Sequence, residues 1–261
     1  MKKPLLFALS LAALAGSGFV YARWIEPEWL VVTEHRETVA GLETPLRLAV
    51  VGDLHAERFG PFEQRVLDAI DNAQVDAVLV VGDLVTPSGL TEAANRFLGA
   101  LDAPLGVFWV PGNHEHWALE GPPEAFFNRG TPLVNRAHRL RDDVWLVGVD
   151  DSLAGEPRPT LALPHTDPSV RIAMLHSPAG VEALAGQVSV AFAGHTHGGQ
   201  IRLPVLGALV LPPGSSRFDA GWFTVAGTRF FVTVGLGTSI ARLRFLCRPE
   251  VAVVDLVPDK G

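Results

Sequence analysis

The sequence predicts an α/β fold in which a second β-sheet packs on the first. Between residues 46 and 117, short apolar runs typical of buried strands alternate with segments that have helical spacing, as expected of βαβ units. From residue 144 onward, strand-like runs follow one another around one short helical segment. Strands without long helices between them favour a separate sheet, which has to bury its apolar face against the first.

The first half of this region is expected to contribute three strands and two helices. Each expected strand is an apolar run that ends in polar residues, as in LAVVGDLH and VLVVGDL. Each expected helix repeats its apolar residues every three or four positions. The expected strands lie within residues 46–55, 76–84 and 105–117, and the expected helices within residues 62–73 and 91–101.

The second half is expected to be mostly β-structure. Runs such as VWLVGV and RIAML are apolar throughout and have the length of ordinary strands. AGVEALAG, residues 179–186, is long enough for a short helix only. The expected strands lie within residues 144–152, 170–178, 188–200, 227–239 and 250–257.

The N-terminal segment is expected to be a membrane anchor or a signal segment. An uncharged apolar run over residues 5–21 would span roughly 26 Å as a helix, near the lower limit for crossing a bilayer. Trp24 and Trp29 follow at positions where interfacial aromatic residues are common. The length of the run favours an uncleaved anchor, and cleavage of a signal peptide before Arg23 is the alternative.

Domain boundaries and orientation follow from this segment. Residues 1–24 would form the anchor or signal segment, residues 25–45 a charged connector, and residues 46–261 one catalytic α/β domain. Lys2 and Lys3 precede the apolar run, so the positive-inside rule keeps the N-terminus in the cytoplasm. A single span would then place the domain outside the cytoplasm, with a cytoplasm-facing domain as the alternative.

The composition indicates a globular protein that is not a general nucleic-acid binder. The chain is 48% hydrophobic and 19% charged, and its formal net charge is −7. Proteins that bind DNA or RNA normally carry a basic face. Cys247 is the single cysteine, so no disulfide can form within the chain. The oligomeric state is left open by the sequence.

Polar side chains with metal-binding chemistry follow five of the expected strands. In an open α/β sheet the strand ends form the ligand crevice, so these groups are expected to converge. An isolated HTH sequence is as readily a surface turn as a metal site, but five such strand ends together favour the metal site. The residues are Asp53, His55, Asp83, Asn113, His114, His176, His195 and His197.

The donor types narrow the choice of metal. In an extended chain, side chains two positions apart point the same way, so Asp53 with His55 and His195 with His197 present paired donors. Carboxylate, amide and imidazole donors without thiolates suit Mn²⁺, Fe or Zn²⁺. The set is too large for one four-coordinate ion and suits two ions that share a carboxylate. Asp83, alone on its strand, is the expected bridge.

Five motifs, GDLH, GDL, GNHE, LHSP and GHTH, resemble in order those of the calcineurin-like metallophosphoesterase superfamily, and they span residues 52–197. The later SRF…GW, VGLGTS and CRPE resemble a membrane-tethered branch with YkuE-like and LpxG-like hydrolases. The resemblance implies a four-layer α/β/β/α sandwich, in which two mixed β-sheets are flanked by helices.

The resemblance also implies residue roles. His114, beside a ligand but not itself one, would protonate the leaving oxygen as general acid. A hydroxide bridging two divalent ions would attack phosphorus, with manganese favoured over iron or zinc. One ion would be held by Asp53, His55, Asp83 and His197, and the other by Asp83, Asn113, His176 and His195.

The implied function is hydrolysis of phosphodiester or pyrophosphate bonds at a membrane surface, on a lipid-linked or nucleotide-linked phosphate ester. A narrower interpretation is a UDP-2,3-diacylglucosamine-type pyrophosphate hydrolase of lipid A synthesis. A non-catalytic, metal-dependent binding protein on the same fold is a third alternative, and the presence of His114 counts against it. Thr86 and Pro87 stand where the protein phosphatases of the superfamily carry aspartate and arginine, which argues against phosphoserine or phosphothreonine substrates.

Several residues close to the motifs are expected to be structural. Glu115 would either support a ligand or face solvent, and His116 would be structural or exposed. Asp150 and Asp151 are expected to cap a turn, with lining of the crevice as the alternative. Four aromatic residues are expected in the core or at its rim, with a wall for a lipid tail as the alternative, and three histidines are expected at the surface: Trp109, Trp117, Phe126 and Phe127, and His35, His138 and His165.

Overall fold

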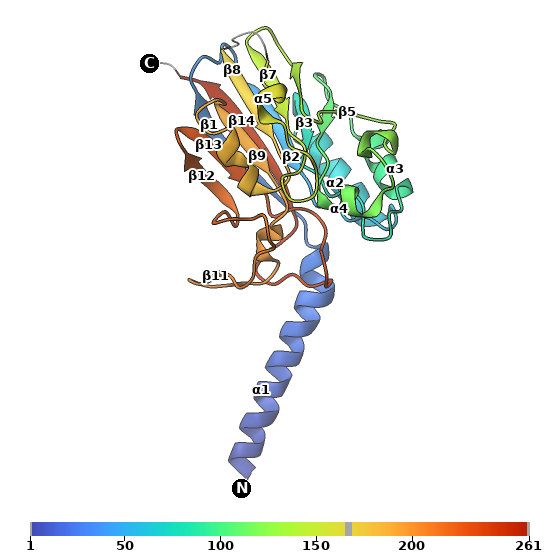
Figure 1. The fold of residues 1–261 in the computed structure, drawn as a ribbon. Helices are drawn as coiled ribbons and strands as arrows, with labels where there is room; N and C mark the ends of the chain where they lie inside the picture. Colours follow the sequence, from blue (N-terminus) through green and yellow to red (C-terminus); the bar gives the residue numbers. More distant parts are fainter. Residues whose placement is uncertain (1, 165–168, 260–261) are drawn as a thin grey trace.

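Two six-stranded β-sheets packed face to face form the centre of the computed structural model, which describes residues 2–164 and 169–259 (Figure 1). The first sheet has the order β1 (Val31–Val39), β14 (Glu250–Pro258), β2 (Leu46–Val51), β3 (Ala77–Val80), β4 (Val107–Trp109) and β5 (Thr131–Pro132). The second has the order β12 (Gly221–Val225), β13 (Thr228–Val232), β9 (Val190–Ala193), β8 (Val170–Met174), β7 (Val144–Gly148) and β6 (Arg136–Arg139).

Both sheets are mixed, as the family resemblance implies. In the first sheet, β2, β3, β4 and β5 are parallel, while β14 runs antiparallel to β2 and parallel to β1. In the second sheet, β7, β8, β9 and β13 are parallel, and the edge strands β6 and β12 are antiparallel to their neighbours. The parallel strands of each sheet therefore end together, and this arrangement collects the loops that follow them.

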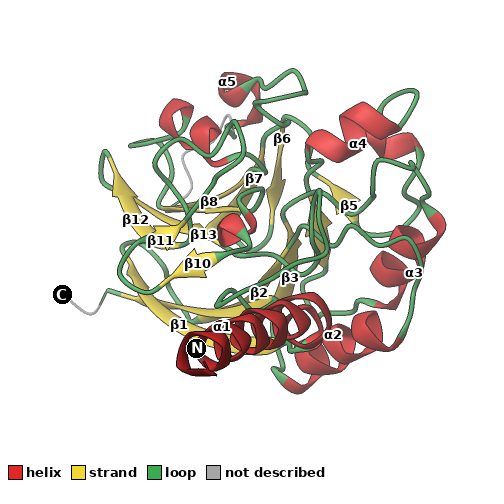
Figure 2. Cartoon of the chain, turned by 90° about the horizontal axis from the view of Figure 1, so that it is seen from below, coloured by secondary structure: helices red, strands yellow, loops and turns green. Residues whose placement is uncertain are grey.

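Helical segments cover the outer faces and complete four layers (Figure 2). The helices α2 (Pro61–Asn72) and α3 (Glu92–Ala100) lie on the outside of the first sheet and confirm the two expected helices to within one residue at each end. The expected helix at 179–186 is instead a 3₁₀ segment over Pro178–Ala183, and with α5 (Pro159–Ala162) it covers the second sheet.

The central strands are apolar without alternation because both of their faces are buried. On β2, Leu48 and Val50 join the core between the sheets, whereas Ala49 and Val51 join the core under α2 and α3. A strand that is buried on both sides gives a continuous apolar run, which is the signal that the sequence showed.

Part of the expected connector is in fact an edge strand. Residues 31–39 form β1, which pairs in parallel with β14. Its side chains alternate between exposed positions such as Glu34 and Arg36 and partly buried positions such as His35 and Glu37. Because only one face packs on the protein, the strand carries many charges and its sequence reads as a polar connector.

The N-terminal helix α1 (Lys2–Val20) projects away from the sheets (Figure 1). It continues through a π-helical turn, Tyr21–Ile25, and a 3₁₀ turn, Glu26–Glu28, before β1 begins. Within the described part of the chain, no helix has both the length and the apolar character that a membrane crossing requires. The single span expected in residues 1–24 is therefore not supported, since α1 mixes its apolar residues with lysine, serine and glycine.

Replacement of a side chain between the sheets tests this core. Phe192 on β9 is fully buried and packs near Phe231 of the neighbouring strand, with ring centroids 6.4 Å apart. Phe192→Ala should lower the free energy of unfolding by about 3–5 kcal/mol, measured by denaturant titration. Leu161→Ala on the exposed surface of α5 is the control and should change it by less than about 0.5 kcal/mol. Equal effects of the two substitutions would contradict the inter-sheet core.

Candidate metal centre

Five strand ends bring the polar side chains singled out by the sequence to one place. The first sheet provides the ends of β2, β3 and β4, and the second provides those of β8 and β9. The site therefore lies where corresponding ends of two packed sheets meet, rather than along the edge of one sheet. The side chains that follow these strands are Asp53 and His55, Asp83, Asn113 and His114, His176, and His195 with His197.

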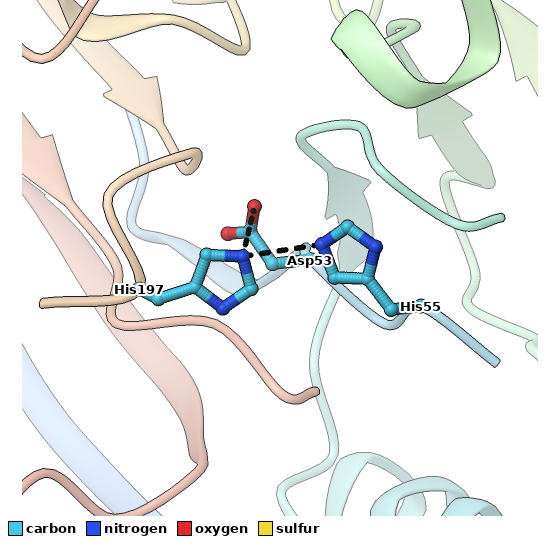
Figure 3. A group of neighbouring side chains, drawn as sticks. All are labelled: Asp53, His55 and His197. Carbon is cyan, nitrogen blue, oxygen red and sulfur yellow. Dashed lines mark hydrogen bonds and ion pairs between the residues drawn. The ribbon is translucent and has the colours of Figure 1, made fainter. Parts of the chain in front are cut away.

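One group consists of Asp53, His55 and His197 (Figure 3). The Nε2 atom of His197 lies 3.1 Å from Nε2 of His55 and 3.6 Å from Oδ1 of Asp53. The backbone N–H of His195 donates to both carboxylate oxygens of Asp53, at 2.9 and 3.0 Å. Three candidate ligands from β2 and β9 thus face one another across the two sheets.

A second group consists of Asp83, His176 and His195. The Nε2 atom of His176 lies 3.3 Å from Oδ2 of Asp83. Oδ1 of Asn113 completes this group, at 3.1 Å from Nε2 of His176 and 2.8 Å from Nδ1 of His195. The resemblance assigns these same residues to two ions. The one difference is that Asp83 belongs to both ion sites in the resemblance and is counted here only in the second group.

Asp83 lies between the two groups. Its Oδ2 is 3.5 Å from Nε2 of His55, in the first group, and 3.3 Å from Nε2 of His176, in the second. The same oxygen is 4.0 Å from Nε2 of His114, so His55, Asp83 and His114 form a third cluster of metal-binding type. One carboxylate is therefore within reach of both candidate ion positions and of the expected general acid.

The directions of the imidazole nitrogens fit a metal centre. Nδ1 of His55 faces the carbonyl of Val85 at 3.1 Å, and Nδ1 of His176 faces the carbonyl of Val81 at 2.8 Å. A carbonyl only accepts, so each Nδ1 carries the proton and each Nε2 turns a lone pair into the site. His195 does the reverse, because its Nε2 donates to the carbonyl of Pro213.

The spacing of these lone pairs also fits metal ligands. Nδ1 of His195 and Nε2 of His176 are 3.2 Å apart, and each would offer its lone pair to a bound metal ion. Two lone pairs that face each other repel unless a cation lies between them. Two nitrogen ligands of one tetrahedral ion, each about 2.0–2.1 Å from it, are separated by about 3.3 Å. The residues of this chain therefore suit divalent ions.

The loops that carry the ligands adopt left-handed backbone conformations. Asp53, His55, Asp83, His195 and His197 all have φ between 45° and 72°. Non-glycine residues rarely adopt this region, and clusters of such residues are characteristic of functional sites. Gly112 shows how closely the loops pack, because an added Cβ there would lie 2.2 Å from Oδ1 of Asp83.

Burial and mutual charge set the protonation of the site. Burial raises the pKa of Asp53 to about 7 and lowers the pKa of His55 and of His195 to about 4 in each case. Burial also acts on Asp83, but the neighbouring histidines outweigh it and hold the pKa of this carboxyl below its usual value. Low pKa values keep the imidazoles of His55 and His195 neutral, the form that binds metal. Burial also acts to lower the pKa of His176, but the neighbouring Asp83 outweighs it and holds that pKa well above its usual value, so a metal ion would have to displace a proton there.

Glu115 has a larger structural role than the sequence indicated. Its carboxylate is buried and accepts hydrogen bonds from the backbone N–H groups of Asp83, Leu84, Val85 and Gly112, at 2.7–3.0 Å. It therefore ties the loop after β3 to the start of α4 (Asn113–Ala118). The alternative of a solvent-facing Glu115 is wrong. The GNHE motif contains Glu115 and one partner, Gly112, but the other three partners lie about thirty positions away.

Among the residues that the structure describes, no carboxylate holds Nδ1 of His114 in place, although Asp83 lies 4.0 Å from Nε2 of the same ring. Within the described residues, its Nδ1 has no hydrogen-bond partner, and the exposed ring of Trp117 lies 5.5 Å away. Thr86, in the position where protein phosphatases carry aspartate, bonds to Ser88 at 2.6 Å instead. His114 is therefore positioned through its helix and through its backbone N–H, which donates to Oδ1 of Asp83.

His116 and the two aspartates after β7 build the wall beside the site. Nε2 of His116 lies 2.6 Å from Oδ1 of Asp150, and the hydrogen bond raises the pKa of His116. Asp151 caps its own turn by accepting from the N–H groups of Leu153 and Ala154, and it also accepts from Ser177 beside the ligand His176. The expected structural role of His116 and the expected turn caps are confirmed.

The remaining side chains divide between core and surface. Trp109 and Phe127 are buried together with ring centroids 5.1 Å apart, as expected of core residues, whereas Trp117 is exposed. The expectation of solvated histidines is wrong for His35, which packs 4.7 Å from the ring of Phe231, and for His138, which packs 4.8 Å from Phe108. Each ring covers the end of an apolar cluster. His165 lies outside the described residues.

Comparison with known proteins agrees with this geometry. Residues 46–199, more than half of the chain, match the family model described as calcineurin-like phosphoesterase. The chain belongs to this family. It is accordingly a hydrolase that acts on phosphoester bonds, and the groups described above lie in the matched region.

Three relatives are similar over most of their length. The chain is 28% identical to the uncharacterized metallophosphoesterase YkuE of Bacillus subtilis, covering 97% of this chain and 95% of the relative. It is 29% identical to the phosphodiesterase YaeI of Escherichia coli, covering 98% and 99% respectively. It is 25% identical to the UDP-2,3-diacylglucosamine pyrophosphatase LpxG of Chlamydia muridarum, covering 80% and 83%.

Replacement of Glu115 tests the carboxylate clamp. Glu115→Gln puts an NH₂ group among backbone donors and leaves buried N–H groups unsatisfied, which should lower the free energy of unfolding of metal-free protein by about 1–3 kcal/mol. Denaturant titration measures the change. Glu120→Gln, on the exposed turn after the same helix, should be neutral within about 0.5 kcal/mol. An unchanged free energy of unfolding in Glu115→Gln would show that this carboxylate does not hold the loops together.

Proposed function

We propose that the chain hydrolyses phosphodiester or pyrophosphate bonds with two divalent ions. The observation that carries this proposal is the position of Asp83 between two groups of buried histidines. When bound, the ions would polarise the phosphoryl oxygens and lower the pKa of water. Manganese is the proposed metal, as the family resemblance implies, and iron and zinc are alternatives that the thiolate-free donor set also suits.

The ligands are proposed to divide as the two groups do. Asp53, His55 and His197 would hold one ion with Asp83, and His176, His195 and Asn113 would hold the other with the same Asp83. The protonated Nδ1 atoms of His55 and His176, fixed by backbone carbonyls, prevent these rings from turning away from the site. The family relationship supports this division, and the contacts given above are consistent with it.

His114 is proposed to give its proton to the leaving oxygen. Burial lowers its pKa and Asp83 opposes that shift, so the imidazolium is more acidic than in water but is still formed beside a carboxylate. Its Nε2 lies within 4.0 Å of Asp83 at the edge of the second group. An acid in this position can reach an oxygen that departs from a phosphorus bound between the two groups.

A narrower substrate class is proposed as the second candidate. LpxG of Chlamydia muridarum is named as a UDP-2,3-diacylglucosamine pyrophosphatase, and its similarity to this chain extends beyond the matched family region. A lipid-linked pyrophosphate would carry the reaction to a membrane surface. Such a nucleotide-linked substrate would require a site facing the cytoplasm, whereas an extracytoplasmic domain would favour another phosphodiester. Protease protection of the domain in intact cells separates the two candidates.

Removal of the shared charge tests the two-ion model. Asp83→Asn should lose at least one ion and most of the turnover of a soluble phosphodiester such as bis-p-nitrophenyl phosphate, because both groups lose an anionic ligand. Elemental analysis and steady-state rates measure the two effects. Asp68→Asn, on the exposed face of α2, is the matched control and should keep both properties. Two tightly held ions and normal rates in Asp83→Asn would rule out the bridge.

Leaving groups of different basicity test the role of His114. His114→Ala should keep its metal content but slow the hydrolysis of alkyl phosphodiesters by roughly 10²–10⁴-fold, since an alkoxide needs a proton to depart. Esters of p-nitrophenol, whose anion is stable, should be slowed much less. Equal losses on both substrates, or loss of metal, would assign His114 another role.

A further inference from the structure

Three segments far apart in the sequence meet at the base of the N-terminal helix. They are residues 21–29, residues 199–214 with the hairpin of β10 (Arg202–Leu203) and β11 (Gly207–Ala208), and the loop 238–249 (Figure 1). The N–H of Arg202 donates to the carbonyl of Phe245, and the N–H of Arg244 donates to that of Ala22. These bonds fix the three segments as one surface, which we call the basal surface.

The basal surface exposes large apolar side chains. Val205 and Ile240 are fully exposed at the tips of the hairpin and of the loop, and Leu206 and Val210 are about three-quarters exposed. Leu246 is about half exposed beside them. A soluble monomer seldom presents apolar residues on several neighbouring loop tips, and such patches mark interaction sites.

Tryptophan and arginine border these apolar tips. The guanidinium of Arg248 stacks 4.3 Å from the ring centre of Trp29, and that of Arg23 lies 5.3 Å from the ring centre of Trp24. Both tryptophans are about half exposed. Aromatic rings with cationic neighbours around an apolar patch are the composition found at the interface between lipid and water.

The charge of the basal surface is opposite to that of the chain as a whole. Its three segments together contain five arginines and two glutamates, in a chain of net charge −7. Glu28 pairs with Arg242 and Asp219 pairs with Arg202, while Arg244 is buried. Arg248 has no carboxylate partner in an ion pair within the described residues, and it lies at the rim. A partly basic, apolar rim suits an anionic lipid headgroup region.

The same segments contact the loops of the metal centre. The carbonyl of Pro213, just beyond the hairpin, accepts from Nε2 of His195 at 2.6 Å. Arg202 donates to the carbonyl of Gly198, and Sγ of Cys247 lies 3.2 Å from the carbonyl of His197. The basal surface is therefore one layer of residues away from the candidate ligands.

We propose that the basal surface docks on an anionic lipid bilayer and holds the metal centre against it. The apolar tips would enter the outer acyl region, and the tryptophans and arginines would lie among the headgroups. The part of this inference that concerns a lipid-linked substrate rests on the proposed function. The inference as a whole concerns loops of the catalytic domain at the surface from which α1 projects, and it does not require α1 to cross the membrane (Figure 1).

Fluorescent labels at the loop tips test the docking surface directly. Val205→Cys and Ile240→Cys are labelled with an environment-sensitive nitrobenzoxadiazole group in the full chain, and Leu161→Cys on α5 is the matched exposed control. Cys247 is buried, and unlabelled wild type treated in parallel shows whether it reacts. With vesicles of phosphatidylcholine and phosphatidylglycerol, emission at positions 205 and 240 should shift to shorter wavelength, while position 161 should not respond.

Charge insertion provides the second measurement. Val205→Asp combined with Leu206→Asp should lower the fraction of protein that cosediments with these vesicles by roughly tenfold or more, since two aliphatic groups lose their burial. Leu161→Asp should leave it unchanged. Cosedimentation without a response at positions 205 and 240 would overturn the proposal and leave the binding to α1. A shift that needs no vesicles and grows with protein concentration would overturn it in favour of a second copy of the chain.

The two proposals fail in different ways. Loss of the proposed function appears as an absence of metal-dependent hydrolysis of the water-soluble bis-p-nitrophenyl phosphate. Loss of the docking proposal appears in the labels and in cosedimentation, neither of which needs turnover.

Discussion

Burial of the carboxylate of Asp83 is the constraint on which the metal centre depends. A carboxylate in this position would be costly without compensation, and three imidazoles together with the N–H of His114 provide it. Because the compensating groups come from both sheets, the sheets have to pack with their loops in register. The metal centre therefore forms only when the two sheets pack face to face. That packing brings together the loops that follow β2, β3, β4, β8 and β9.

Two buried charged residues outside the ligand set organise the backbone around this centre. Glu115 collects N–H groups from the loops after β3 and β4. Arg244 is its counterpart, because its guanidinium donates to the carbonyls of Val234, Gly235, Gly237 and Cys247. The N–H of Gly237 in turn donates to the carbonyl of Asp53. The Glu115 carboxylate binds backbone N–H groups, and the Arg244 guanidinium binds backbone carbonyls. Together they support loops that have no regular secondary structure of their own.

The sequence was sufficient for features whose signal is local. The candidate ligands could be found because each follows a strand and carries its own metal-binding chemistry. The contacts of Glu115 and Arg244 could not be found, since their partners are backbone groups, which every residue possesses. β1 was missed because an edge strand with one packed face is polar, and its partner β14 lies more than two hundred positions along the chain. The expected membrane span of α1 is not supported, because the uncharged run also contains serines and glycines.

The place of β14 in the first sheet has a consequence for synthesis on the ribosome. This strand inserts between β1 and β2, so the sheet that carries Asp53 and Asp83 remains split until residues 250–258 have left the exit tunnel. Until then β1 has no neighbour and β2 keeps an open edge, which is a template for pairing with another chain. The nascent protein therefore has to remain guarded until residues 250–258 are free to pair, and its affinity for metal would arise late.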